Sequence, residues 1–143
     1  MNTLSPCCAA YIAGLVDADG TITLTRKHIN ENRHPVVSIS NTDRCLLEYV
    51  NKNVGAGKIT AKRTTSKNHR PSFVFAIYNR QAIDLIRQLQ PFLRTYKAAR
   101  AELILNDCRA LTPRNGKYNK EMLLARRCFE ERVLAIKPSD QAH

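Results

Sequence analysis

Hydrophobic residues along the chain recur first at helical spacing and then at every second position, and these two patterns predict a helix followed by strands. The apolar run 7–17 follows a Ser-Pro pair, which is typical of a cap residue with proline at the first helical position. A helix is therefore expected there, ending near Gly20 in the left-handed conformation common at helix C-termini. Segments 21–27 and 36–40 alternate between polar and apolar residues, which indicates two strands, each with one polar face.

The same order of patterns returns further along the chain. Residues 41–57 begin with cap residues, carry apolar residues at helical spacing and end in a Gly-Ala-Gly turn, so they predict a second helix. Residues 58–65 alternate again and predict a third strand, while 72–79 predict a fourth strand whose outward side the pattern does not assign. Further helices are expected at 80–93, broken at Pro91, at 96–111 and at 120–136.

The order of elements is αββαββ followed by helices, and it predicts an α+β fold. Four short strands joined by turns and one crossing helix imply an antiparallel four-stranded sheet with helices on one face. The chain of 143 residues is long enough to bury a core of its own, and we expect a single domain over 1–143.

Basic residues dominate the charge of the chain. Lys and Arg number 23 against 12 Asp and Glu, a net charge of +11, and they are spread along the sequence. Such a surface favours a polyanionic partner, and nucleic acid is the usual one. No apolar run approaches the length that spans a bilayer, so no membrane association is expected. The charged ARR and EER stretches within 120–136 are interpreted as a solvated helix face.

The outward residues of the predicted strands carry hydroxyl and ammonium groups and no acid. Hydroxyls hydrogen-bond to base edges and lysines reach phosphates or guanine acceptors, so this face favours nucleic acid over an ordinary solvated surface. Basic side chains in turns and at neighbouring positions extend the set. The predicted DNA-binding residues are Thr21, Thr23, Thr25, Lys27, His28, Ser38, Ser40, Arg44, Lys58, Thr60, Lys62, Arg63, Thr64 and Arg70.

Cysteine usage and the N-terminus favour an intracellular protein. The five cysteines show no CxxC spacing, which argues against a zinc site or a disulfide framework and favours buried thiols in a reducing compartment. No secretory leader is evident, and the cytoplasm, a nucleoid or an organelle is expected. A calcium-binding loop of the EF-hand type begun at Asp17 fails on spacing, because its fifth and twelfth positions hold Thr21 and His28.

Two acids, Asp17 and Asp19, stand where a helix least favours negative charge. Exposed carboxylates at a helix C-terminus cost about 0.3–1 kcal/mol each, and two residues apart on a helix they point in different directions. The same helix presents small residues every four positions, at Ala10, Gly14 and Ala18. These allow either tight packing within the chain or the crossing of two copies, which would bring one acid from each copy together with divalent cations.

The stretch IAGLVDADG, residues 12–20, resembles the LAGLIDADG signature of homing endonucleases with two conservative changes. The αββαββα order, the VGAG turn before the third strand and the segment QLQPFLRTYKAAR agree with the same family. The resemblance covers about residues 5–110 and implies a LAGLIDADG core whose four-stranded sheet forms a saddle on DNA, with the helices on the opposite face. A C-terminal helical extension at about 111–138 would follow this core.

The resemblance also implies roles for residues of the site. The last acid of the signature, Asp19, is expected to bind the metal, together with the backbone carbonyl of Ala18. Asn41 at the end of the second strand is expected to position water. Lys97 is expected to lie near the cleaved phosphate, with Arg94 as a close alternative.

A chain with one signature motif implies a homodimer that recognises a long, nearly palindromic DNA site. The expected dimer interface consists of Ala10, Ala13, Gly14 and Asp17, the last in a structural, capping role. The implied activity is Mg²⁺-dependent cleavage of both DNA strands, with two or three divalent ions per dimer, as in homing endonucleases encoded by introns or inteins. The alternative is a non-cleaving protein of the same fold, either a maturase that binds its own intron RNA or a DNA-binding regulator.

Overall fold

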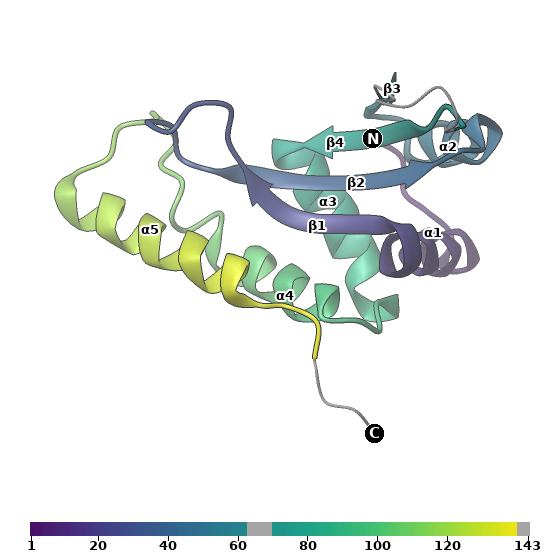
Figure 1. Ribbon diagram of the computed structural model, residues 1–143. Helices are drawn as coiled ribbons and strands as arrows, with labels where there is room; N and C mark the ends of the chain where they lie inside the picture. Colours follow the sequence, from purple (N-terminus) through teal and green to yellow (C-terminus); the bar gives the residue numbers. More distant parts are fainter. Residues whose placement is uncertain (63–69, 140–143) are drawn as a thin grey trace.

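An antiparallel four-stranded sheet with helices on one side forms the molecule (Figure 1). The computed structural model describes residues 1–62 and 70–139. The elements in chain order are α1 (Pro6–Asp19), β1 (Gly20–Thr25), β2 (His34–Asn41), α2 (Arg44–Val54), β3 (Lys58–Ala61), β4 (Phe73–Tyr78), α3 (Asn79–Leu89), the short 3-10 helix η1 (Gln90–Phe92), α4 (Lys97–Asp107) and α5 (Lys120–Ala135). The α+β class and the order of elements expected from the sequence are therefore confirmed.

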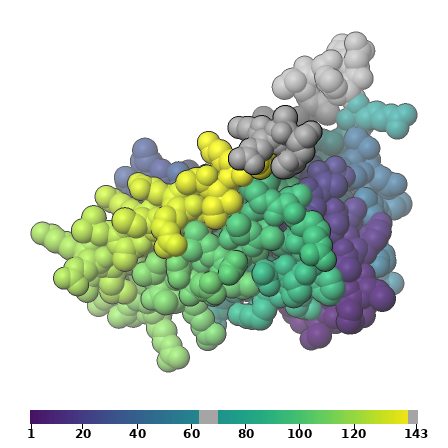
Figure 2. Space-filling view, turned by 90° about the horizontal axis from the view of Figure 1, so that it is seen from below, coloured from purple at the N-terminus to yellow at the C-terminus, as the bar shows by residue number. Residues whose placement is uncertain are grey.

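The two faces of the sheet differ because successive side chains of a strand point to opposite sides. The strand order is β1-β2-β4-β3, and every neighbouring pair is antiparallel. One face buries apolar side chains such as Ile22, Val37, Phe75 and Ile77 against the helices. Figure 1 places α1, α3, α4 and α5 on that side, and Figure 2 views the molecule from there, with α1 in purple at one end. Within the described residues no helix covers the other face, which we call the open face.

The C-terminal helix α5 shares its core with the first part of the chain. Its Phe129 and Val133 are buried in the cluster that also holds Ile12 of α1 and Ile104 of α4. The segment expected as an extension thus packs onto the body of the molecule. Among the described helices, none is long and apolar enough to cross a membrane.

Helix α1 runs directly into β1, and the expectation of a left-handed Gly20 at this junction is wrong. Gly20 is extended, with φ −114° and ψ −178°. A glycine stands here for lack of space, because a Cβ would lie 2.7 Å from the Cα of Val16 and 2.8 Å from the carbonyl oxygen of Ser38. The close approach of β2 to the helix end thus explains the residue, and it brings the end of α1 against the sheet.

Capping residues set the bounds of α2, and a proline follows the end of α3. Asp43 caps α2 by accepting from the backbone N–H of Cys45, and Gly55 ends it in the left-handed conformation with φ 74°. The helix expected over 80–93 stops at Leu89, and Pro91 lies in η1. Strand β3 is shorter than the predicted 58–65, and residues 63–65 of that prediction lie outside the described residues.

Candidate active site and nucleic-acid interface

The ends of α1 and β2 meet, and this brings Asp19 and Asn41 together. Gly20 pairs with Ile39 across the β1–β2 ladder, so Asn41 at the end of β2 lies beside the last residue of α1. The Asn41 Nδ2 donates to the Asp19 carboxylate at 3.4 Å. The Oδ1 of the same amide accepts from the backbone N–H of Asp43 at 2.8 Å, which fixes its orientation. Asp19 is exposed, so one face of its carboxylate is open to a ligand.

Asp17 has a different environment, although it is only two residues away. Its carboxylate accepts from the Thr95 hydroxyl at 2.6 Å, the Arg94 backbone N–H at 2.9 Å and the Thr95 N–H at 3.2 Å. Partial burial raises the pKa of Asp17, but these hydrogen bonds and the nearby Lys97 ammonium outweigh it and hold the pKa below its usual value. Asp17 therefore ties the end of α1 to the turn before α4 within its own chain.

The side chain of Lys97, the first residue of α4, contacts the C-terminal end of α1. Its side chain is nearly buried, and its Nζ donates to the carbonyl of Val16 at 2.8 Å and to that of Asp17 at 2.9 Å. Burial lowers the pKa of Lys97, while the attraction of Asp17 and Asp19 opposes the shift and Arg100 adds to it. An ammonium at these carbonyls offsets the partial negative charge of the helix end, which reduces the cost of the two acids there.

The described residues of one chain do not form a complete metal-binding cluster. Within residues 1–62 and 70–139 no three His, Cys, Asp or Glu side chains lie close enough together to hold a metal ion. Asp19 and the adjacent carbonyl of Ala18 are oxygen donors, which suit a hard divalent cation such as Mg²⁺. These donors fit such an ion, but further oxygen ligands must come from outside the described chain.

The open face carries many of the predicted DNA-binding residues in rows across the strands. Thr21, Ser38, Ala76 and Lys58 lie opposite one another in one such row. The register places the following predicted residues on this face: Thr21, Thr23, Thr25, Ser38, Ser40, Lys58 and Thr60. The structure therefore gathers hydroxyl and ammonium groups from β1, β2 and β3 on one surface.

Two aromatic rings of the open face, those of Tyr78 and His34, lie outside the predicted set of DNA-binding residues. The register places Tyr78 of β4 opposite Val36, and His34 opposite Thr25. Tyr78 is 47% exposed, and its ring lies 5.9 Å from that of His34 between centroids. Both faces of β4 are apolar in sequence, so only its pairing with β2 shows that Tyr78 points outward.

Other predicted DNA-binding residues lie elsewhere. Lys27, His28, Lys62 and Arg70 are exposed beyond the ends of strands. Arg44 of α2 is exposed, its guanidinium lies 5.3 Å from the ring centre of Phe73 and pairs with Glu48 at 3.0 Å, and its contact with DNA stays a prediction. Arg63 and Thr64 lie outside the described residues.

The outer side of α1 presents a stripe of small residues. Ala10, Gly14 and Ala18 are exposed, and no atom lies within 4 Å of a Cβ built on Gly14. Ala13 is fully buried in the core of its own chain, so its assignment to a dimer interface is corrected. The carboxylate of Asp17 is likewise turned to its own chain. The surface open to a second copy is therefore narrower than the sequence suggested.

Comparison with known proteins identifies a family. The chain has the fold of the homing endonuclease I-CvuI in complex with its target, at 20% identity and a TM-score of 0.75 over 96% of this chain and 87% of that one. The archaeal intron-encoded homing endonuclease I-Vdi141I complexed with DNA gives 17% identity, a TM-score of 0.60 and coverage of 94% and 86%. The sequence matches no curated protein. Residues 6–96, well over half of the chain, match the LAGLIDADG-like domain, and the chain belongs to that family.

Proposed function

We propose that this protein is a site-specific endonuclease that cuts double-stranded DNA as a homodimer. The observation that carries the proposal is the exposed Asp19 beside Asn41, at the end of a helix whose outer side is open to a second copy. One carboxylate per chain is too little for a metal site, and the crossing of two α1 helices would supply the second. The small side chains at Gly14 and Ala18 permit that close approach.

The open face and the charge support DNA as the substrate. The described residues of that face include no acid at the register positions, and the chain carries a net charge of +11, which a dimer doubles. Neutralised phosphates release counterions, so strong and salt-dependent binding is expected. The structures of I-CvuI and I-Vdi141I that share this fold hold DNA.

In the proposed mechanism, each residue of the site has a separate task. Asp19 and the carbonyl of Ala18 from each chain would hold divalent ions, two or three per dimer. When bound, such an ion lowers the pKa of water and stabilises the leaving 3′-oxygen of the phosphodiester. Asn41, which is oriented by Asp43 and contacts Asp19, would hold the water in position. The Lys97 ammonium would offset negative charge that develops on the phosphate.

A selection from random DNA tests the proposal. Purified protein is incubated with a library of nearly palindromic duplexes, with Mg²⁺ in one arm and Ca²⁺ in the other, and the cut ends are sequenced. Symmetric double-strand cuts that appear only with Mg²⁺ are expected. Enrichment of bound DNA without cuts in either arm would instead identify a DNA-binding regulator, and tight binding to a structured intron RNA without cutting would identify a maturase.

The dimer has its own test at Gly14. Gly14→Glu is expected to convert the protein to a monomer that cuts no DNA, because a charged side chain would stand between the crossing helices. The free energy of unfolding of the monomer should rise by about 0.5–1 kcal/mol, since glycine disfavours a helix interior and open space surrounds the site. Sedimentation velocity and thermal unfolding measure both effects. Ala125→Glu on the exposed side of α5 is the control, and a cutting dimer of Gly14→Glu would contradict the interface.

A further inference from the structure

The loop between β1 and β2, residues 26–33, lies at the end of the sheet remote from Asp19. The ladder pairs Gly20 with Ile39 next to the site and Thr25 with His34 at the far end. Five residue steps along a strand span about 17 Å, so the loop lies about half a turn of B-DNA away from the proposed cleavage centre. If DNA lies along the open face, this loop meets the outer base pairs of each half of the target.

The tip of this loop carries side chains suited to base contacts. Lys27, His28 and Asn30 are exposed, and Ile29 is 80% exposed. Lysine and asparagine hydrogen-bond to base edges, and an apolar side chain contacts the methyl group of thymine. Contacts of this kind discriminate between bases only when the backbone that bears them is held in one position.

Two buried side chains of α5 hold that backbone where the loop enters β2. The backbone N–H of Arg33 donates to the Glu130 Oε1 at 2.7 Å, and the Arg33 carbonyl accepts from the Arg126 Nη2 at 2.6 Å. Arg126 is 3% exposed and Glu130 is 6% exposed. The backbone N–H and the carbonyl of Arg33 are therefore both held by side chains of α5. We call Glu130 and Arg126 the loop clamp.

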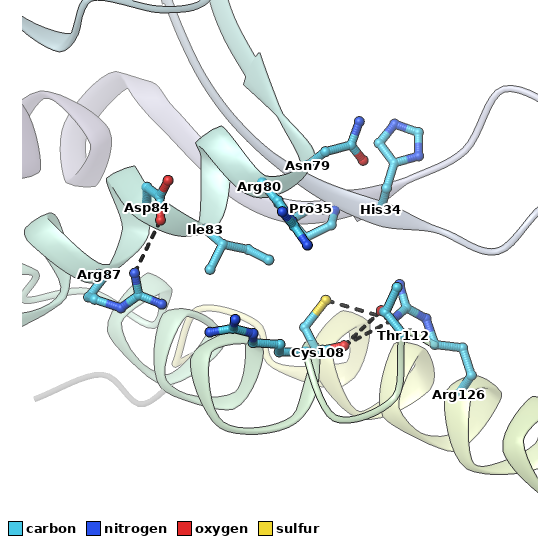
Figure 3. Close-up of a pocket in the computed structure, with 11 residues that line it drawn as sticks. His34, Pro35, Asn79, Arg80, Ile83, Asp84, Arg87, Cys108, Thr112 and Arg126 are labelled. Carbon is cyan, nitrogen blue, oxygen red and sulfur yellow. Dashed lines mark hydrogen bonds and ion pairs between the residues drawn. The ribbon is translucent and has the colours of Figure 1, made fainter. Parts of the chain in front are cut away.

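Arg126 of the clamp is itself held by hydrogen bonds to the segment that follows α4. The Arg126 Nη1 donates to the Thr112 hydroxyl at 2.7 Å and to the Cys108 carbonyl at 3.4 Å (Figure 3). Its Nε lies 3.7 Å from the Glu130 carboxylate and is buried without a hydrogen bond. Removing charged groups from water is costly, and a buried ion pair is a poor source of stability compared with apolar packing. The arrangement is thus better suited to fixing a position than to stabilising the fold.

A pocket lies beside the clamp. The pocket has a volume of about 390 Å³ and opens between His34 and Pro35 of β2, Ile83 of α3 and Arg126 of α5. Figure 3 shows His34 and Pro35 on one side of the opening and Thr112 and Arg126 on the other. The hydrogen bonds of the clamp cross beside this pocket and connect α5 to Arg33, directly before β2.

We propose that Glu130 and Arg126 are positioning residues that hold the β1–β2 loop in its DNA-reading position, so that α5 sets base preference at the outer ends of each half-site. The inference rests on the proposed function. It concerns a helix that lies outside residues 6–96, the part of the chain that matches the family model.

The test measures base preference at each position of the target. Wild-type protein and Glu130→Ala are compared by selection from the DNA library, by binding in Ca²⁺ and by cutting in Mg²⁺. Discrimination at the outer base pairs is expected to fall about tenfold in Glu130→Ala, the scale of one base-pair mismatch, with central preferences retained. Glu130→Gln keeps an acceptor for the Arg33 N–H and should restore most of the outer preference. Faster hydrogen exchange over residues 26–33 in Glu130→Ala is expected without DNA.

Two controls separate positioning from general loss of stability. Val133→Ala removes buried apolar volume from α5 without touching Arg33, and Glu131→Ala changes an exposed charge on the same helix. Both should leave the outer preference unchanged. Equal loss of outer preference in Val133→Ala and Glu130→Ala, or full outer preference in Glu130→Ala, would overturn the clamp while leaving the endonuclease proposal intact. Wild-type protein that selects no DNA would overturn both.

Discussion

Asp19→Asn is expected to abolish DNA cleavage while DNA binding is retained. Asparagine keeps the size of the side chain but loses the negative charge that a divalent cation requires. A metal ion supplies several kcal/mol of transition-state stabilisation, so the cleavage rate should fall about 10³-fold or more. Folding should not suffer, because the exposed carboxylate at a helix C-terminus costs about 0.3–1 kcal/mol and its loss relieves that cost.

Single-turnover cleavage of the selected target and equilibrium binding in Ca²⁺ measure the two effects separately. Asp84→Asn is the matched control, since Asp84 is an exposed acid of α3 whose only ion pair in the described chain joins it to Arg87. It should cut at the wild-type rate. Residual cutting by Asp19→Asn close to that of Asp84→Asn would remove Asp19 from the metal site and with it the proposed mechanism.

Lys97→Met should have the second largest effect, and it acts on both stability and cleavage. The ammonium contacts the carbonyls of Val16 and Asp17, and its loss leaves polar groups at the end of α1 without that donor. The free energy of unfolding is expected to fall by about 1–3 kcal/mol. Cleavage should fall about 10²-fold at saturating DNA, because a fixed positive charge near the reacting phosphate is lost.

Arg94→Ala distinguishes the two cations that sequence alone leaves as candidates. The Arg94 side chain is exposed and only its backbone N–H contacts Asp17, so this variant should keep most of its stability and activity. Chemical denaturation and single-turnover rates provide the comparison. A large loss of cleavage in Arg94→Ala with near-normal cleavage in Lys97→Met would assign the phosphate-facing charge to Arg94.

Much of the fold could be predicted because alternating polarity, caps and turns all act locally. The strict alternation of β1 and β2 identified their polar faces, and Asp43 and Gly55 marked the ends of α2. The outward side of β4 could not be predicted because both its faces are apolar. Only the pairing of β4 with β2 shows that Tyr78 points outward. Gly20 was misassigned because its reason is the proximity of a distant strand, which no local pattern reports.

The site was predicted in outline, and its details depend on contacts between distant segments. Asp19 and Asn41, which the family resemblance assigned to the site separately, lie within hydrogen-bond distance of each other. The solvated face expected for the last helix is wrong at Arg126 and Glu130, because a charged residue gives no sign in sequence of a partner such as Arg33, more than ninety positions away. Ala13 is a small residue of α1 like Ala10 and Gly14, but it lies on the side of the helix that packs into the core.

The proposed division of the metal site between two chains has a consequence for dosage. Each chain offers the exposed carboxylate of Asp19 at the end of α1, and the described residues contain no group of three His, Cys, Asp or Glu side chains that could hold a metal ion. In our proposal a lone chain is inert, so while dimers are scarce the amount of active nuclease rises with the square of the chain concentration. Halving expression would then cut nuclease activity fourfold. Under this proposal, the need for two chains would by itself limit double-strand breaks in the host at low expression, without an inhibitor.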